Sequence, residues 1–179
     1  MARSTRAIRE ARRLLDEVSL RQHPIDPMKI ADHVGVDVRY EKLTEISGLT
    51  FHGERGSRIV VNELHSPTRK RFTLAHELGH HLLHSGHRLV LDPSTRVSRR
   101  DELSSLATDS QEIEANAFAA ELLMPASFLR QSLTDLLSKH SDLDSTEIVA
   151  HLAESFEVSD EAMQYRLTNL GIHAVDVYY

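Results

Sequence analysis

The stretch "RFTLAHELGHHLLH" at residues 71–84 constrains this chain more than any other part of its sequence. His76 and His80 stand four residues apart, so on a helix their imidazoles project from one face and can bind a single tetrahedral metal ion. Glu77 is rotated by about 100° from His76, which places it beside such an ion rather than on it. A base that activates water belongs at that position. The stretch therefore predicts a metal-binding helix with its own base.

A third ligand has to come from elsewhere, because catalytic zinc sites take three protein ligands. The chain has twelve histidines and no cysteine, so any metal must be held by histidine and carboxylate. The extended motif of the metzincins needs a glycine at position 83 and a histidine at 86, where this chain has Leu83 and Gly86. Without a third ligand, the alternative interpretation is a surface helix that happens to be rich in histidine.

A second helical stretch, "EIEANAFAAELLMP", offers the glutamates Glu112, Glu114 and Glu121. On a helical wheel the apolar stripe of this segment centres about 50° from Glu112, about 110° from Glu114 and about 130° from Glu121. A carboxylate directed at an apolar face needs a cation. We therefore predict Glu112 as the third ligand, with Asn116 one turn along to orient it. Glu114 remains the second choice.

Periodicity and turn residues predict an α+β fold, in which a small antiparallel three-stranded sheet packs on the zinc-binding helix and the C-terminal half is mostly helical. Residues 87–110 are polar and aperiodic, which predicts a long surface loop. We expect a core at 1–124 that holds the metal site and a helical subdomain at 125–179 packed on it. The expected helices lie at 4–21, 27–34, 67–85, 110–124, 126–139, 145–156 and 159–170, and the expected strands at 36–42, 47–53 and 57–63.

The charge and the distribution of apolar residues bear on the partners and the location of the protein. The net charge is −6, which gives no electrostatic basis for general nucleic-acid binding. Residues 145–171 scan as helix, turn and helix, but their five acidic residues against one arginine disfavour a DNA-reading role. The basic run "RVSRR" at 96–100 is interpreted as solvated charge. No apolar run reaches the length of a membrane span and no signal peptide is evident, so we expect a cytoplasmic protein.

Three stretches together resemble the ImmA/IrrE family of metallopeptidases: "RFTLAHELGHHLLH", "EIEANAFAAELLMP" and the strands "SGLTFH…IVVNE". "IADHVGVDV" upstream and "VSDEAMQYRLTNLG" downstream extend the resemblance over nearly the whole chain. The resemblance implies a gluzincin-like zinc site with His76, His80 and Glu112 as ligands and Glu77 as catalytic base.

The resemblance also implies a substrate class: helix-turn-helix transcriptional repressors of bacteria or phages, which are cut to relieve repression under stress or DNA damage. Some family members are paired with such a repressor in modules that resemble toxin–antitoxin operons. No repressor domain is fused to this chain, so we expect the repressor to be a second protein.

The expected function is therefore a zinc-dependent endopeptidase of narrow specificity with a helix-turn-helix repressor as substrate or partner. A metal-bound sensor or binding protein without proteolysis is the alternative, and hydrolysis of a non-peptide substrate is a third interpretation. The site also suits other divalent ions such as Mn²⁺. His52, Asn62 and the C-terminal tyrosines are unranked candidates for a donor to the oxyanion. The strand "RIVVN" at 58–62 is expected to offer an edge to an extended substrate.

Overall fold

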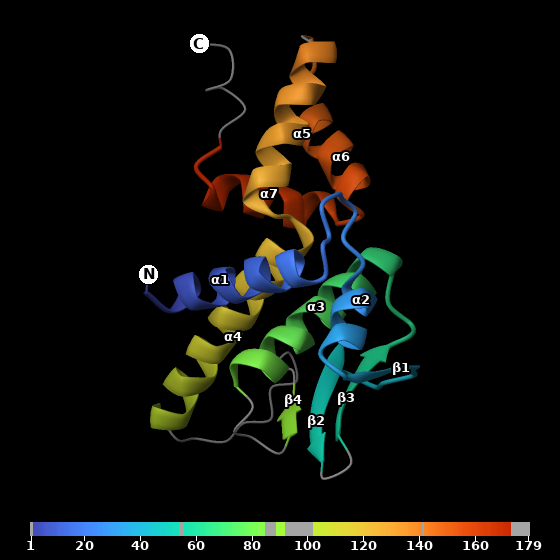
Figure 1. Cartoon of the computed structure of the whole chain (residues 1–179), viewed down its shortest axis with the longest axis vertical. Helices are drawn as coiled ribbons and strands as arrows, with labels where there is room; N and C mark the ends of the chain where they lie inside the picture. Colours follow the sequence, from blue (N-terminus) through green and yellow to red (C-terminus); the bar gives the residue numbers. More distant parts are fainter. Residues whose placement is uncertain (1, 54–55, 85–88, 92–101, 141, 173–179) are drawn as a thin grey trace.

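The structure of the chain is a computed structural model that describes residues 2–53, 56–84, 89–91, 102–140 and 142–172. It confirms the α+β class, with helices grouped against a small sheet (Figure 1). None of the helices in these ranges is long and apolar enough to cross a lipid bilayer. The helices are α1 (Ala2–Glu17), α2 (Pro27–His33), α3 (Pro67–Leu83), α4 (Glu102–Leu123), α5 (Ala126–Lys139), α6 (Ser145–Phe156) and α7 (Asp160–Asn169).

The sheet has the strand order β1-β3-β2-β4 and is mixed rather than wholly antiparallel. β2 and β3 form the expected hairpin, while β1 runs parallel to β3. The chain passes from β1 to β2 across the end of β3, and the Asn62 side chain holds this connection by donating to the carbonyls of Leu43 at 2.9 Å and Ile46 at 3.0 Å. The strands are β1 (Asp37–Glu41), β2 (Gly48–Gly53), β3 (Gly56–Asn62) and β4 (Leu89–Leu91).

This strand order contradicts the expectation that β3 offers an edge to a substrate. β3 lies between β1 and β2, and its backbone groups are paired on both sides. The far side of β2 is paired with β4, where Thr50 lies opposite Val90. The pattern of side chains along a strand reports which face is buried but not which neighbours it has, so the error was one of strand order.

The prediction of a loop over residues 87–110 is wrong at both ends. β4 occupies Leu89–Leu91, and α4 begins at Glu102, eight residues before the expected start of that helix. The segment "ELSSLATD" contains neither glycine nor proline, so nothing in it stops a helix from extending toward the N-terminus. The intervening residues 92–101, which include the basic run at 96–100, lie outside the described residues.

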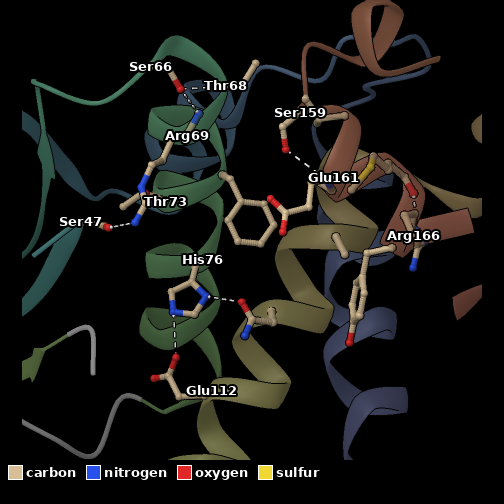
Figure 2. Close-up of a pocket in the computed structure, with 17 residues that line it drawn as sticks. Ser47, Ser66, Thr68, Arg69, Thr73, His76, Glu112, Ser159, Glu161 and Arg166 are labelled. Carbon is tan, nitrogen blue, oxygen red and sulfur yellow. Dashed lines mark hydrogen bonds and ion pairs between the residues drawn. The ribbon is translucent and has the colours of Figure 1, made fainter. Parts of the chain in front are cut away.

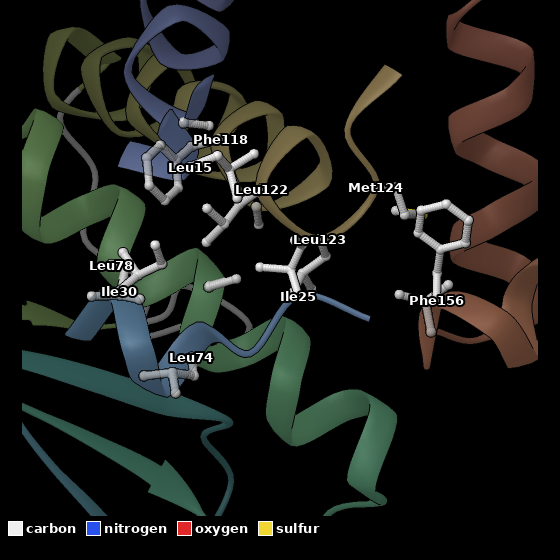
Figure 3. Packing of buried hydrophobic residues seen from close by; sticks show 14 of the residues in the cluster. Leu15, Ile25, Ile30, Leu74, Leu78, Phe118, Leu122, Leu123, Met124 and Phe156 are labelled. Atoms are coloured by element: carbon white, nitrogen blue, oxygen red, sulfur yellow. The ribbon is translucent and has the colours of Figure 1, made fainter. Parts of the chain in front are cut away.

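The metal helix α3 lies in the middle of the molecule. It packs on β2 and β3 on one side and on α4 on the other, and α1 covers α4 from outside (Figure 1). One hydrophobic cluster joins these elements to the C-terminal helices: it includes Leu74 and Leu78 of α3 and Phe118 and Leu122 of α4 (Figure 3), and it reaches Phe156 of α6. α3 is therefore held in a rigid interior, which suits a helix that must place ligands.

A buried ion cluster ties α1, α4 and α7 together. Glu121 of α4 is 1% exposed and accepts from Arg12 at 2.7 Å and from Arg166. Arg166 is itself 5% exposed, and its Nε donates to the carbonyl of Met124 at 3.1 Å. Glu121 therefore balances the charge of the buried Arg166 guanidinium inside the protein.

We expect the substitution Glu121→Gln to lower the free energy of unfolding by about 3 to 5 kcal/mol, because it leaves the buried Arg166 cation without a counter-ion. The melting temperature should then fall by roughly 6 to 20 °C. Arg12→Ala is the matched control: the Arg12 side chain is 58% exposed, so its loss should cost about 1 kcal/mol or less. Urea denaturation of the three proteins measures this, and equal midpoints for both variants would contradict the prediction.

Candidate metal centre

Local sequence places the motif of α3 in the interior. Ser66 caps the helix by accepting from the backbone N–H of Arg69, and Pro67 occupies the first turn, where its missing N–H is not needed. The apolar positions Leu74, Ala75 and Leu78 are fully buried, which turns the motif toward the middle of the fold. His76, Glu77 and His80 are consequently buried as well.

His76, His80 and Glu112 converge on one point. The Nε2 atoms of the two histidines are 3.0 Å apart, and the Glu112 carboxylate lies 3.2 Å from the Nε2 of His76 and 2.9 Å from that of His80. Two imidazoles and a carboxylate that bind one tetrahedral zinc ion at 2.0–2.1 Å have donor atoms about 3.3 Å apart. Among the described residues this is the one group of three or more such side chains arranged to hold a metal ion. The donor set and its spacing fit zinc.

Asn116 fixes the ring of His76. The Nδ1–H of His76 donates to the Oδ1 of Asn116 at 3.0 Å, which leaves the Nε2 lone pair directed at the other two ligands. The sequence argument assigned Asn116 to Glu112, so the residue lies at the site but orients His76 instead. The Nδ1 of His80 has no hydrogen-bond partner in the part of the chain that the structure describes.

Glu112 is held in its charged form. Burial alone raises the pKa of this carboxyl, but hydrogen bonds and charge from His76 and His80 outweigh burial and lower the pKa to about 2. Glu112 is thus a carboxylate throughout the neutral range and is ready to bind a cation.

Close contact of α3 and α4 brings Glu112 to the histidines, and Gly79 allows it. A Cβ at Gly79 would lie 3.0 Å from the Cα of Ala115 and 3.2 Å from its carbonyl oxygen. A larger residue at the fourth position of the motif would press on the α4 backbone and move Glu112 outward. The glycine thus acts as a spacer between the two ligand-bearing helices.

Thr50 of β2 is a site residue that the sequence argument missed. Its hydroxyl donates to the Oε2 of Glu77 at 2.7 Å, and both side chains are fully buried. The strand comes this close because Gly48 has no side chain: a Cβ there would lie 2.6 Å from the Cγ2 of Thr73 and 3.2 Å from the Cγ of Glu77. Gly48 and Thr50 are two residues apart, so they lie on the same face of β2. This spacing is the only signal in the sequence for the contact.

The remaining histidines of the stretch do not join the cluster. His81 stacks on His52 of β2 with ring centroids 5.1 Å apart, and the Nε2 of His84 lies 3.4 Å from Glu114. Burial lowers the pKa of His52, His81 and His84. They are therefore neutral at pH 7 and do not oppose a bound cation. His87 lies outside the described residues.

Glu112 lies beside the two histidines, where the wheel argument expected it, and its role as a ligand stays a prediction. The wheel argument was wrong about the burial of the two other glutamates. Glu114 and Glu121 were expected to lie off the inward face, yet they are 7% and 1% exposed. α4 is covered by α1 as well as by α3, so it has inward faces on two sides. Of the oxyanion candidates, Asn62 is engaged in the β1–β2 connection, His52 is stacked on His81, and the C-terminal tyrosines lie outside the described residues.

A groove of about 740 Å³ opens from the cluster between α3 and α7. His76, Glu112 and Asn116 form its metal end, and Arg69 and Glu161 lie farther along it (Figure 2). Its apolar lining consists of Phe72, Ala120, Met124, Val158, Ala162 and Tyr165. The size and the mixed lining are typical of a site for a small molecule or a few residues of peptide.

The fold and the site define a class: helix-and-sheet proteins in which two histidines of a His-Glu-x-x-His helix and a glutamate of a second helix are arranged to hold a metal ion. The model of the M78 peptidase family, described as the IrrE N-terminal-like domain, matches residues 31–168. The chain belongs to this ImmA/IrrE family of metallopeptidases.

Two curated relatives and one solved structure are similar to the chain. It is 32% identical over 101 residues to an uncharacterized immunity region protein 2 of Bacillus phage phi105, an alignment of 56% of this chain and 59% of that protein. It is 23% identical over 150 residues to the metallopeptidase ImmA of Bacillus subtilis strain 168, covering 84% and 79%. A Mycobacterium tuberculosis transcriptional regulator shares the fold, with a TM-score of 0.62, 21% identity, and coverage of 92% of this chain and 46% of that one.

Proposed function

We propose that this protein is a zinc-dependent endopeptidase that cleaves a helix-turn-helix transcriptional repressor and thereby relieves repression. The observation that carries the proposal is the joint arrangement of four groups. The candidate ligand atoms of His76, His80 and Glu112 lie within 4.8 Å of one another. Glu77, on the same helix as the two histidines, is buried and accepts a hydrogen bond from Thr50. A site that only bound a metal would need the ligands but not an oriented base beside them.

The chemistry follows from the donor set. His76, His80 and Glu112 would hold the zinc ion, which would supply a Lewis acid to activate water and polarise a carbonyl group. Glu77 accepts the proton of the attacking water and passes it to the leaving amine. Thr50 keeps the Glu77 carboxylate in one orientation by its hydrogen bond, so the base does not have to be ordered during the reaction.

The repressor as substrate rests on the relatives. One is named a metallopeptidase and another an immunity region protein, and the family resemblance implies repressors as targets. Roles in a stress response or in a toxin–antitoxin-like module, and action in the cytoplasm, belong to the same proposal. The second candidate function, a non-proteolytic metal-bound partner of a repressor, predicts binding without a cut.

Co-expression with a candidate helix-turn-helix repressor, sought first in the adjacent reading frames, tests the proposal. The full chain should convert the repressor to two fragments whose masses add up to the intact protein plus one water. Chelation of the metal in the purified mixture should stop the conversion, and a Glu77→Gln chain should leave the repressor intact. A stable complex with an uncut repressor in all three arms would instead establish the non-proteolytic partner and overturn the peptidase.

A further inference from the structure

The groove beside the metal centre has α7 as its second wall, and α7 comes from the C-terminal helices rather than from the helices that carry the ligands. Val158, Glu161, Ala162 and Tyr165 all line the groove, and its metal end is built by α3 and α4. Figure 2 shows Glu161 on the wall opposite α3, above the level of His76. Any chain segment bound at the metal centre and lying in this groove must therefore contact α7.

The α7 wall is fixed in place at both ends. Just before its start, Arg71 of α3 forms an ion pair with Glu157 at 3.0 Å and donates to the backbone carbonyl of the same residue at 3.2 Å. At its other end, Arg166 is tied to Glu121 of α4. A wall anchored on both ligand-bearing helices keeps its distance from the metal site, as a subsite for one substrate segment requires.

The side chains of α7 that line the groove include an acid and an aromatic, beside Ala162 and Arg166, whose charge is paired with Glu121. Glu161 and Tyr165 stand four residues apart, so they project from one helix face. Tyr165 is 70% exposed, and Glu161 forms no ion pair with any other described residue. The Arg69 guanidinium on the other wall points away from α7 and donates to Ser47 at 2.8 Å (Figure 2). The α7 side of the groove is thus acidic, with an exposed ring beside the acid.

DNA does not suit this surface. Arg166 is the only lysine or arginine between residues 145 and 171, and it is buried in its ion pair. Helices α6 and α7 therefore present acidic side chains with no exposed arginine or lysine among them, and phosphate would be repelled. A basic segment of a protein has the complementary charge, and an aromatic ring of low rotamer entropy is a frequent anchor for an apolar side chain.

The length of the groove sets the length of the segment. Arg69 and His76 are seven residues apart on α3, which corresponds to about 10 Å along the helix axis. An extended peptide advances about 3.3 Å per residue. The groove therefore accommodates about three residues next to the metal centre.

We propose that this groove binds about three extended residues of the substrate on one side of the cleaved bond, and that Tyr165 selects an apolar side chain and Glu161 a basic one within that segment. The inference rests on the proposed peptidase function for its link to a cut, but not for the binding itself. Tyr165 and Glu161 are specificity residues, and the C-terminal helices are the element that distinguishes one repressor sequence from another.

A randomised peptide library displayed on phage tests the proposal on the zinc-loaded full chain carrying Glu77→Gln, which should bind peptides without cutting them. The retained peptides should be enriched in lysine or arginine next to an apolar residue. With a synthetic copy of the best peptide, adding Glu161→Lys should raise the dissociation constant about fivefold to tenfold, and the effect should shrink at high salt. Adding Tyr165→Ala should raise it about tenfold.

Two matched controls separate the groove from general charge and surface effects. Asp160→Lys makes the same charge reversal in the same turn of α7 but outside the groove, and Tyr40→Ala removes another exposed tyrosine, on β1. Both should leave the dissociation constant within about twofold. Three outcomes would each overturn the groove assignment. The retained peptides could lack basic residues, the best peptide could bind the Glu161→Lys chain equally well, or no peptide could be retained at about 1 mM.

The selected peptides also separate this inference from the proposed function. Incubated with the unmodified zinc-loaded chain, they should be cut at one bond. Charge-dependent binding without any cut would count against the peptidase and leave the groove assignment standing. Cutting that does not respond to Glu161→Lys or Tyr165→Ala would count against the groove assignment and leave the peptidase standing.

Discussion

The substitution Glu77→Gln is expected to lower the rate of repressor cleavage by about a hundredfold to ten-thousandfold while the protein still binds one zinc ion. Glutamine has the size of glutamate and can still accept the hydrogen bond of Thr50, but it cannot take a proton from water, and a positioned base contributes about that factor. Zinc should remain because Glu77 lies outside the group formed by His76, His80 and Glu112.

The measurement is the single-turnover cleavage rate of the purified repressor, with zinc content determined by mass spectrometry on the same samples. Glu154→Gln, an exposed glutamate of α6 that does not line the groove, is the matched control and should cleave at the unmodified rate. Cleavage by the Glu77→Gln chain within a few-fold of that rate would remove Glu77 as the base.

The substitution Glu112→Gln is expected to weaken zinc binding by about a hundredfold to a thousandfold, whereas Glu114→Gln should change it by a few-fold at most. Structural zinc sites bind with roughly 10–16 kcal/mol, so each of four ligands contributes roughly 2.5–4 kcal/mol. Glu112 is within 3.2 Å of both histidine Nε2 atoms. Glu114 instead faces His84.

Competition for zinc with a chromogenic chelator measures both dissociation constants. His80→Ala and His84→Ala form a second matched pair, one within α3 and one at its C-cap, since His80 is in the ligand group and His84 is not. Circular dichroism on each apo-protein checks that the fold is kept. Should Glu114→Gln lose zinc while Glu112→Gln retains it, the third ligand would be Glu114, the second choice of the helical wheel.

Much of the fold could be predicted from local signals. The hairpin of β2 and β3 and the helices α5, α6 and α7 lie within a few residues of their expected ranges, because capping residues, prolines and glycines mark their ends. The parallel pairing of β1 and the fourth strand could not be predicted, since a strand pattern does not specify its neighbours. The division into 1–124 and 125–179 stays a prediction, although one hydrophobic cluster runs through both parts.

The sequence by itself determined the features that depend on helix geometry. A spacing of four residues places His76 and His80 on one face whatever the surroundings, and the wheel of α4 selected Glu112 by the same rule. The roles of these residues as ligands, and of Glu77 as base, stay predictions until they are measured. Only the tertiary structure decided which residues from other elements surround the site. Thr50 meets Glu77, Asn116 meets His76 rather than Glu112, and α7 lines the groove, because these contacts join parts of the chain that no local periodicity relates.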